Sequence, residues 1–262
     1  MNIKAKKSLG QNFLIDRAVL EKIVSTTDIN NKEILEIGPG SGNLTTYILK
    51  KNPQKIYVIE KDDNLSLLLK EKFNNEIVII NNDVLKVNVE KISDQKLTVF
   101  GNLPYNISTE ILSKWIVNID NIFWFESLIL MFQKEVADRI IAKFNTSKYG
   151  RLSILSNWKL NIEKIIDIKP ESFSPRPKID SSLLLFTPKN NFFELENPKN
   201  LEMMTRVFFS QRRKMLKKPF NQVFQNAKDI SEKLEIDLNL RPQNLEPEVY
   251  FKLVKEFEKL SS

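Results

Sequence analysis

The loop Gly101-Asn102-Leu103-Pro104-Tyr105 holds the side chains of this sequence that are best suited to chemistry, and it follows a short apolar run. The carboxamide oxygen of Asn102 and a backbone carbonyl of the loop could accept both hydrogens of an exocyclic amine on a planar base, which would expose the nitrogen lone pair. Pro104 would stiffen the loop, and Tyr105 offers a ring on which the base can stack. An Asn-x-Pro turn after a strand is the simpler reading. The pattern favours group transfer to a base amine, driven by placement and electrostatics.

Three of the six glycines of the chain, Gly38, Gly40 and Gly42, fall within one five-residue window after another apolar run. Glycine permits a tight turn and lets the backbone approach a ligand closely. The spacing G-x-G-x-G differs from the G-x-G-x-x-G that is typical of pyrophosphate-binding loops. A tight strand-to-helix turn would explain these glycines without a ligand. In a chain with so few glycines, however, their concentration favours a ligand site.

Two carboxylates follow the next two apolar runs. Glu60 could accept hydrogen bonds from both ribose hydroxyls of a nucleoside, and Asp83 could accept one from an adenine amine. Each alone is more simply a solvated carboxylate at the end of a strand. Together with the glycine window they would meet at the carboxyl edge of a parallel sheet, where such folds bind ligands. The pattern predicts a nucleoside ligand without a pyrophosphate, such as S-adenosylmethionine.

The elements that must position these residues are short strands rich in Ile and Val, which alternate with segments of helical spacing. Strands are expected at 33–37, 56–60, 77–81, 97–100 and 127–131, and helices at 44–51, 64–73, 109–117 and 134–144. This alternation predicts βαβ units and a parallel sheet. Two further strands, at 157–168 and 181–186, have no full helix between them, so they predict an antiparallel addition at one sheet edge.

The strand pattern stops after residue 188, and the remaining segments have helical spacing at 201–210, 213–225, 229–234 and 247–260. We therefore expect a catalytic domain over residues 1–188 and a small all-α domain over residues 189–262. Residues 203–228 include seven basic side chains and no acidic one, and Lys4, Lys6 and Lys7 lie in a second acid-free stretch. Local positive charge suits the binding of a phosphate backbone, although a solvated helix face explains it equally well.

The composition of the 262 residues excludes several kinds of chemistry. Without Cys or His there is no disulfide, thiolate metal site, cysteine nucleophile, imidazole base or Ser-His-Asp triad. Methyl transfer to a base amine needs no general base, so these absences do not count against it. The chain has a net charge of +7, no signal-peptide pattern and no long apolar run. We expect a cytoplasmic protein without a membrane segment.

A set of motifs extends over nearly the whole chain: Ser8–Leu14, Glu36–Gly42, Val58–Glu60, Gly101–Ser108, Gln133–Glu135, Tyr149–Leu152, Phe173–Ser181, Gln211–Lys214 and Leu240–Leu245. Together they resemble the ribosomal RNA adenine dimethyltransferase family, and within it the KsgA-type enzymes of the small subunit. The resemblance implies a Rossmann-like class I methyltransferase fold and S-adenosylmethionine as cofactor, with no metal. It also implies N6,N6-dimethylation of two adjacent adenosines in the 3′-terminal hairpin loop of 16S rRNA, during small-subunit biogenesis.

The resemblance also implies a role for each matching position. The cofactor would be held by Gln11, Asn12, Leu14, Gly38, Gly40, Glu60, Asp83 and Asn102. The catalytic loop would consist of Asn102, Leu103, Pro104 and Tyr105, and Tyr105 and Phe173 would sandwich a flipped adenine. RNA phosphates would be held by Arg212, Arg213, Lys214 and Lys217.

Three alternatives remain open. A large-subunit adenine methyltransferase of the macrolide-resistance type would share the fold, the cofactor and most motifs. An RNA-binding assembly factor that has lost catalysis would have no use for a complete transfer loop. A nicotinamide-dependent oxidoreductase is disfavoured by the spacing of the glycines. We expect a monomeric enzyme that acts on 16S rRNA within a small ribosomal subunit or its assembly intermediate.

Overall fold

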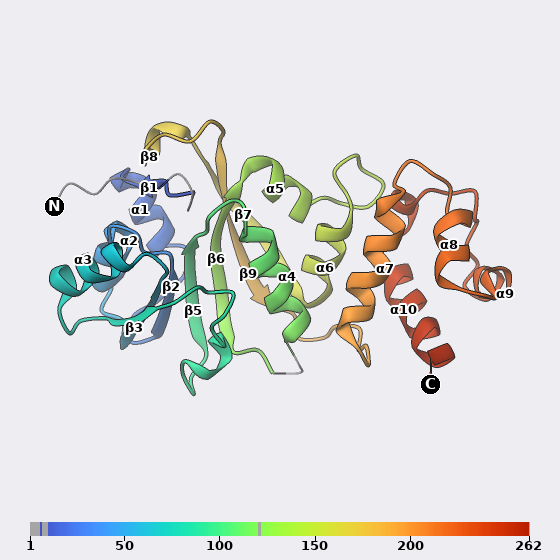
Figure 1. Ribbon diagram of the computed structural model, residues 1–262, viewed down its shortest axis with the longest axis horizontal. Helices are drawn as coiled ribbons and strands as arrows, with labels where there is room; N and C mark the ends of the chain where they lie inside the picture. Colours follow the sequence, from blue (N-terminus) through green and yellow to red (C-terminus); the bar gives the residue numbers. More distant parts are fainter. Residues whose placement is uncertain (1–5, 7–9, 120–121, 262) are drawn as a thin grey trace. The chain divides into compact units, whose positions relative to one another are not determined.

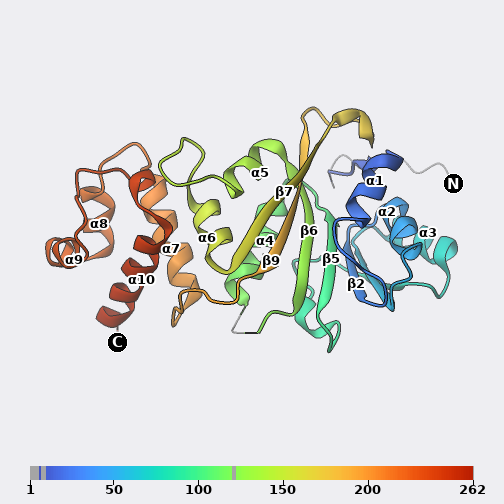
Figure 2. The same cartoon turned by 180° about the vertical axis from the view of Figure 1, so that it is seen from behind.

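The computed structural model describes residues 6, 10–119 and 122–261, and the chain divides into two compact units (Figures 1 and 2). The first unit comprises residues 1–111, 119–137 and 162–188. The second comprises residues 112–118, 138–161 and 189–262. Within the described residues, no helix combines the length and the apolar character needed to cross a membrane.

A seven-stranded sheet lies at the centre of the first unit, in the order β4-β3-β2-β5-β6-β9-β7. Figure 2 labels β2, β5, β6, β9 and β7 of this sheet. Its strands are β2 (Glu33–Ile37), β3 (Lys55–Glu60), β4 (Val78–Asn81), β5 (Leu97–Asn102), β6 (Phe125–Gln133), β7 (Leu160–Ile168) and β9 (Ser181–Pro188). The pairs from β4 through to β6 are parallel, and β9 pairs antiparallel with β6. The predicted parallel sheet with an antiparallel addition is therefore confirmed.

The strands form where the sequence places continuous apolar runs. All five residues of β2 are buried, as are five of the six in β3, which is the pattern of a sheet covered on both faces. The helices of this unit present apolar side chains three or four positions apart, such as Leu65, Leu69 and Phe73 of α3. Leu69 and Phe73 share one core with Ile34 and Phe100 of the sheet.

The helices that begin in this first part of the chain are α1 (Arg17–Val24), α2 (Asn43–Leu49), α3 (Asp63–Phe73), α4 (Ser108–Asn118) and α5 (Lys134–Ile140), with the 3₁₀ turns η2 (Val89–Lys91) and η3 (Pro170–Ser172). A second, two-stranded sheet joins β1 (Phe13–Leu14) to β8 (Phe173–Ser174) in antiparallel fashion. It brings the N-terminal segment of the chain onto the loop between β7 and β9.

The second unit is helical, with α6 (Arg151–Lys159), α7 (Pro198–Ser210), α8 (Lys217–Val223), α9 (Ala227–Lys233), α10 (Pro247–Ser261) and the 3₁₀ turn η4 (Pro242–Asn244). Aromatic side chains fill its core. The Phe208 ring lies edge-on to Phe220 and Tyr250, with centroid distances of 5.4 and 5.6 Å. Such pairs add to the stability that burial alone provides.

Three predicted elements differ from the structure. The strand expected from residue 157 begins only at Leu160, because the preceding residues form α6. Helix α6 buries Ile154, Leu155 and Trp158, which is helical spacing, and the Ser153 hydroxyl caps its start by accepting from the Gly150 N–H at 2.8 Å. The helix expected over 134–144 ends at residue 140, and the one expected over 213–225 is confined to 217–223.

Candidate active site

A cavity of about 200 Å³ lies at the carboxyl ends of β2, β3, β4 and β5, and the N-terminal segment also lines it. The predicted site residues that line it are Gln11, Asn12, Leu14, Gly38, Gly40, Glu60, Asp83, Asn102, Leu103, Pro104 and Tyr105. The fold thus brings together eleven positions that are up to 94 residues apart in the sequence. This is the edge at which open α/β sheets bind their ligands.

The glycine loop is held in place by backbone contacts that a side chain would disturb. The Gly38 N–H donates to the Ile59 carbonyl at 2.9 Å, and the Gly40 N–H donates to Glu60 Oε2 at 3.2 Å. Gly40 has a φ of +59°, and a Cβ there would lie 2.7 Å from the ring of Phe13. Only glycine therefore permits both this turn and the position of Phe13, which also lines the cavity.

Glu60 is a buried carboxylate, with 6% of its surface exposed. Burial raises its pKa, while backbone N–H groups of Asp62 and Gly40 partly offset that effect by donating to the two carboxylate oxygens. Each oxygen retains capacity to accept a further hydrogen bond. A carboxylate of this kind suits a ligand that presents a pair of hydroxyl donors.

Glu36 and Lys72 are residues of this region to which the sequence analysis assigned no role. Burial raises the pKa of Glu36 to about 7, although the Thr45 hydroxyl donates to it at 2.7 Å. Lys72, on α3, donates to the carbonyls of Ser41 and Gly42 at 3.0 and 3.2 Å. Lys72 thus fixes the glycine loop to α3. This contact joins residues that are distant in the sequence, so only the tertiary structure shows it.

The N-terminal segment is anchored through Asp62, which lies two residues after Glu60 of the cavity. Lys6 Nζ lies 2.7 Å from one carboxylate oxygen, and Gln11 Nε2 donates to the group at 3.3 Å. Burial raises the pKa of Asp62, but these bonds and the one from the Asn64 N–H hold it below its usual value. Lys4, Lys7, Ser8 and Leu9, which belong to the predicted basic stretch and N-terminal motif, lie outside the described residues.

Asp83 follows β4 and lies at the rim of the cavity. It accepts from Lys61 at 2.8 Å and from the Leu85 N–H at 3.0 Å, and the bond from Lys61 lowers its pKa. The group is therefore ionised at neutral pH and able to accept from a ligand amine.

Asn102, the last residue of β5, is held in one orientation by the N-terminal segment. Its Nδ2 donates to the Asn12 carbonyl at 2.9 Å, so the side-chain oxygen remains as the acceptor. The Pro104 carbonyl accepts the N–H groups of Ile107 and Ser108 at 3.1 Å, which fixes the turn into α4. The Tyr105 hydroxyl shares a hydrogen bond of 2.6 Å with Ser181 Oγ on β9, and burial raises the pKa of this tyrosine.

Phe173, predicted to stack on the substrate base, is not among the residues that line the cavity, and only 3% of its surface is exposed. It lies in β8, opposite Leu14 of β1. The Ser172 hydroxyl donates to Asp16 at 3.0 Å, and the Ile15 N–H donates to the Ser172 carbonyl at 2.8 Å. The predicted pairing of Phe173 with Tyr105 around a base stays a prediction.

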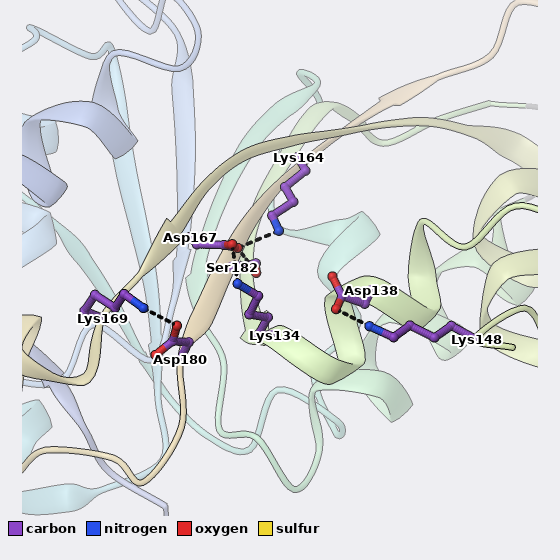
Figure 3. A network of polar contacts seen from close by, with 8 residues as sticks. All are labelled: Lys134, Asp138, Lys148, Lys164, Asp167, Lys169, Asp180 and Ser182. Atoms are coloured by element: carbon purple, nitrogen blue, oxygen red, sulfur yellow. Dashed lines mark hydrogen bonds and ion pairs between the residues drawn. The ribbon is translucent and has the colours of Figure 1, made fainter. Parts of the chain in front are cut away.

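A network of charged residues holds the base of the loop that carries Phe173 (Figure 3). Asp167 accepts from Lys134, Lys164 and Ser182, each at 2.6 Å, and Lys169 binds Asp180 at 2.8 Å. Burial raises the pKa of Asp167, but the three donors hold it well below its usual range. The ends of the loop at 169–180 are therefore fixed to β7, β9 and the start of α5.

The predicted RNA-binding residues lie in the helical unit and fall into two groups. Arg213, Lys214 and Lys217 are exposed and form no ion pair within the described part of the chain. Arg212 is half-buried and donates to Gln243 Oε1 at 3.1 Å and to the Thr146 carbonyl at 3.2 Å.

Comparison with known proteins gives consistent matches over the full length. The family model described as "Ribosomal RNA adenine dimethylase" matches residues 2–259. The chain is 79% identical to "Ribosomal RNA small subunit methyltransferase A" of Pelagibacter ubique, over 99% of each chain. A solved dimethyladenosine transferase from Plasmodium falciparum has a TM-score of 0.80 at 27% identity, covering 95% of this chain and 98% of that one. The 23S rRNA methyltransferase ErmE shares the fold, with a TM-score of 0.67 at 22% identity over 96% of this chain and 100% of that one.

Proposed function

The chain belongs to the ribosomal RNA adenine dimethylase family, and we propose from this that it dimethylates N6 of two adjacent adenosines in the 3′-terminal hairpin loop of 16S rRNA during small-subunit biogenesis. It is an rRNA adenine dimethyltransferase with a class I methyltransferase fold. The observation that carries the proposal is the fixed carboxamide of Asn102, at the rim of a cavity that also holds Glu60 and Asp83.

The family and the fold imply S-adenosylmethionine as the cofactor, and the residues present fit it. Glu60 would accept from its ribose hydroxyls, and Asp83 from its adenine amine. Gly38 and Gly40 leave room for its amino-acid end, while Gln11, Asn12 and Leu14 would cover it. When bound, the cofactor supplies a methyl group activated by a sulfonium centre, and the proposed transfer requires no metal.

The Asn102 loop would prepare the nitrogen that receives the methyl group. Asn102 Oδ1 and the Leu103 carbonyl would accept the two hydrogens of the adenine amine, because the Pro104 carbonyl is occupied by the turn into α4. Acceptors in this arrangement favour a pyramidal nitrogen with an exposed lone pair. The contribution of the loop would be to place this nitrogen and expose its lone pair to the methyl group that the cofactor would supply, and the displaced proton of the amine would leave to solvent. Tyr105 would hold the flipped base by stacking, with Phe173 on its other side.

The helical region 189–262 would bind the RNA backbone, and Arg213, Lys214 and Lys217 supply exposed positive charge for it. We infer that the enzyme works as a monomer in the cytoplasm on a small ribosomal subunit or its assembly intermediate.

The proposal is tested by incubating the protein with methyl-labelled S-adenosylmethionine and with each purified, unmethylated ribosomal subunit. Label should enter the small subunit and yield N6,N6-dimethyladenosine on nuclease digestion. Label confined to the large subunit would assign the chain to the macrolide-resistance type of activity instead. No transfer to either subunit, together with no cofactor binding by calorimetry, would support an assembly factor without catalysis.

A further inference from the structure

Arg212 joins three segments of the helical unit that lie far apart in the sequence. Its guanidinium donates to Gln243 and to the backbone carbonyls of Thr146 and Ser147. Asn145 adds two more links to the same turn, since its N–H donates to the Gln243 carbonyl at 2.9 Å and its side chain accepts from Asn244 at 2.7 Å. The loop between α5 and α6 therefore lies beside the end of α7, as both views show (Figures 1 and 2).

These three segments, 141–150, 211–218 and 238–245, contain no acidic residue. They contain eight basic residues, which are Lys143, Lys148, Arg212, Arg213, Lys214, Lys217, Lys218 and Arg241. Lys148 binds Asp138 at 2.6 Å (Figure 3), and Arg212 is occupied by the contacts above. The other six are exposed, and in the part of the chain that the structure describes they form no ion pair. So many unpaired cations on joined segments repel one another unless an anion binds.

The loop 141–150 also exposes an aromatic ring among these cations. Phe144 is 43% exposed, next to Lys143 and two residues from the carbonyl that Arg212 binds. Asn145 has a φ of +62°, and the Thr146 hydroxyl donates to the Lys143 carbonyl at 2.6 Å, so the loop has a defined shape. An exposed ring beside unpaired cations is how proteins bind unpaired nucleotides, with the base stacked on the ring and the phosphates on the cations.

We propose that loop 143–147, held by Arg212, is a binding site for an unpaired nucleotide of the RNA substrate. Phe144 stacks on the base, and Lys143, Arg213 and Lys214 bind the adjoining phosphates. Arg212 is a positioning residue, not a phosphate ligand as the sequence analysis expects. The inference rests on the proposed function, because the RNA that fills this site is the one that is methylated at the cavity.

The test for the stacking role compares Phe144→Ala with Leu260→Ala, which removes another exposed apolar side chain of the same unit. Binding of unmethylated small subunits and of their protein-free 16S rRNA is measured by filter retention at fixed salt. Phe144→Ala should weaken binding of both on the order of tenfold, the scale of one base–aromatic stack. Leu260→Ala should leave it unchanged. Equal binding by Phe144→Ala and wild type would overturn the proposal. So would a loss seen with intact subunits but absent with protein-free rRNA, because the loop would then contact a ribosomal protein.

The test for Arg212 uses Arg212→Lys and Arg212→Gln, with Arg206→Gln as the control for a nearby exposed arginine. A lysine keeps the charge but cannot bridge Gln243 and two carbonyls, so both Arg212 variants should weaken RNA binding alike. Both variants should also speed tryptic cleavage after Lys143, because the loop loses its support. Loss of a residue that only binds phosphate would leave the cleavage rate unchanged. Rescue by Arg212→Lys with unchanged proteolysis would show a phosphate ligand instead.

Methyl transfer by the wild type distinguishes an error in the proposed function from an error in the nucleotide site. If the wild type transfers no methyl group to small subunits, the proposed function is wrong. If it does, and Phe144→Ala binds and methylates as the wild type does, only the nucleotide site is wrong.

Discussion

Asn102 is the residue on which the proposed chemistry depends, because its carboxamide is held by one hydrogen bond from Nδ2 to the Asn12 carbonyl. Asn102→Ala should abolish methyl transfer by removing the acceptor for the adenine amine. The loss should be at least on the order of a hundredfold in kcat, as for the removal of other oriented polar groups. Calorimetric binding of S-adenosylmethionine should remain measurable. Asn118→Ala, at an exposed position, is the matched control. Wild-type activity in the Asn102 variant would rule out the assigned site.

Glu36 gives the molecule a titration near neutral pH. Its pKa is raised by burial from 4.5 to about 7, so between these values the folded chain keeps a proton that the unfolded chain releases. Stability should therefore fall as the pH rises through this window. Glu36→Gln should remove that loss. Its free energy of unfolding, relative to that of the wild type, should rise by on the order of 3 kcal/mol as the pH increases from 4.5 to 8.

Chemical denaturation of both proteins across this pH range measures the difference. The control is Glu90→Gln, at an exposed position. A parallel pH dependence of wild type and Glu36→Gln would contradict the raised pKa.

At the scale of elements, the glycine loop depends on the helix that packs beneath it. Gly42 has a φ of +73°, and a Cβ there would overlap the ring of Phe73 on α3. Gly42→Ala should therefore destabilise the protein by roughly 2–4 kcal/mol, through backbone strain and overpacking. Gly150→Ala is the control, because the backbone there is extended and the nearest atom to its Cβ would be 3.6 Å away. Equal melting temperatures for the two variants would disprove this role of Gly42.

The elements differ in how far the sequence could predict them. The strands of the parallel sheet were predictable because each is a short, mainly apolar run, fully buried in β2 and largely buried in β3, β5 and β6, and the ligand-facing residues follow at their ends. The end of helix α6 was wrongly predicted as a strand, since Trp158, Leu160 and Ile162 alternate with polar residues, a strand pattern that begins within the last turn of the helix. Three contacts were not predictable, because each joins residues more than 25 positions apart through a side-chain hydrogen bond. They are Gln11 with Asp62, Lys72 with Ser41, and Arg212 with Gln243.

At the scale of the whole molecule, a net charge of +7 on 262 residues predicts strongly salt-dependent binding to RNA. The double variant Arg213→Gln/Lys214→Gln should bind small subunits more weakly. The slope of log affinity against log salt should also fall by about 1.4, since each lost phosphate contact removes roughly 0.7 for single strands. This slope is obtained from affinities measured between about 50 and 200 mM KCl.

The matched control is Lys199→Gln/Lys252→Gln, which removes the same charge at exposed positions elsewhere in the helical unit. If both double variants change the slope equally, the effect is one of net charge and the basic segment has no special role.

The two-residue pairing of β1 with β8, supported by the bond between Ser172 and Asp16, has a consequence for the timing of the reaction. An element this short opens locally much more often than the seven-stranded sheet unfolds. Phe13 belongs to this sheet and Asn12 adjoins it, and both line the cavity. Because the Asn12 carbonyl also accepts from Asn102 Nδ2, opening of the sheet would release the Asn102 carboxamide from its fixed orientation. Methyl transfer would then be possible only while this small sheet is paired, because only the paired state holds the Asn102 acceptor in place.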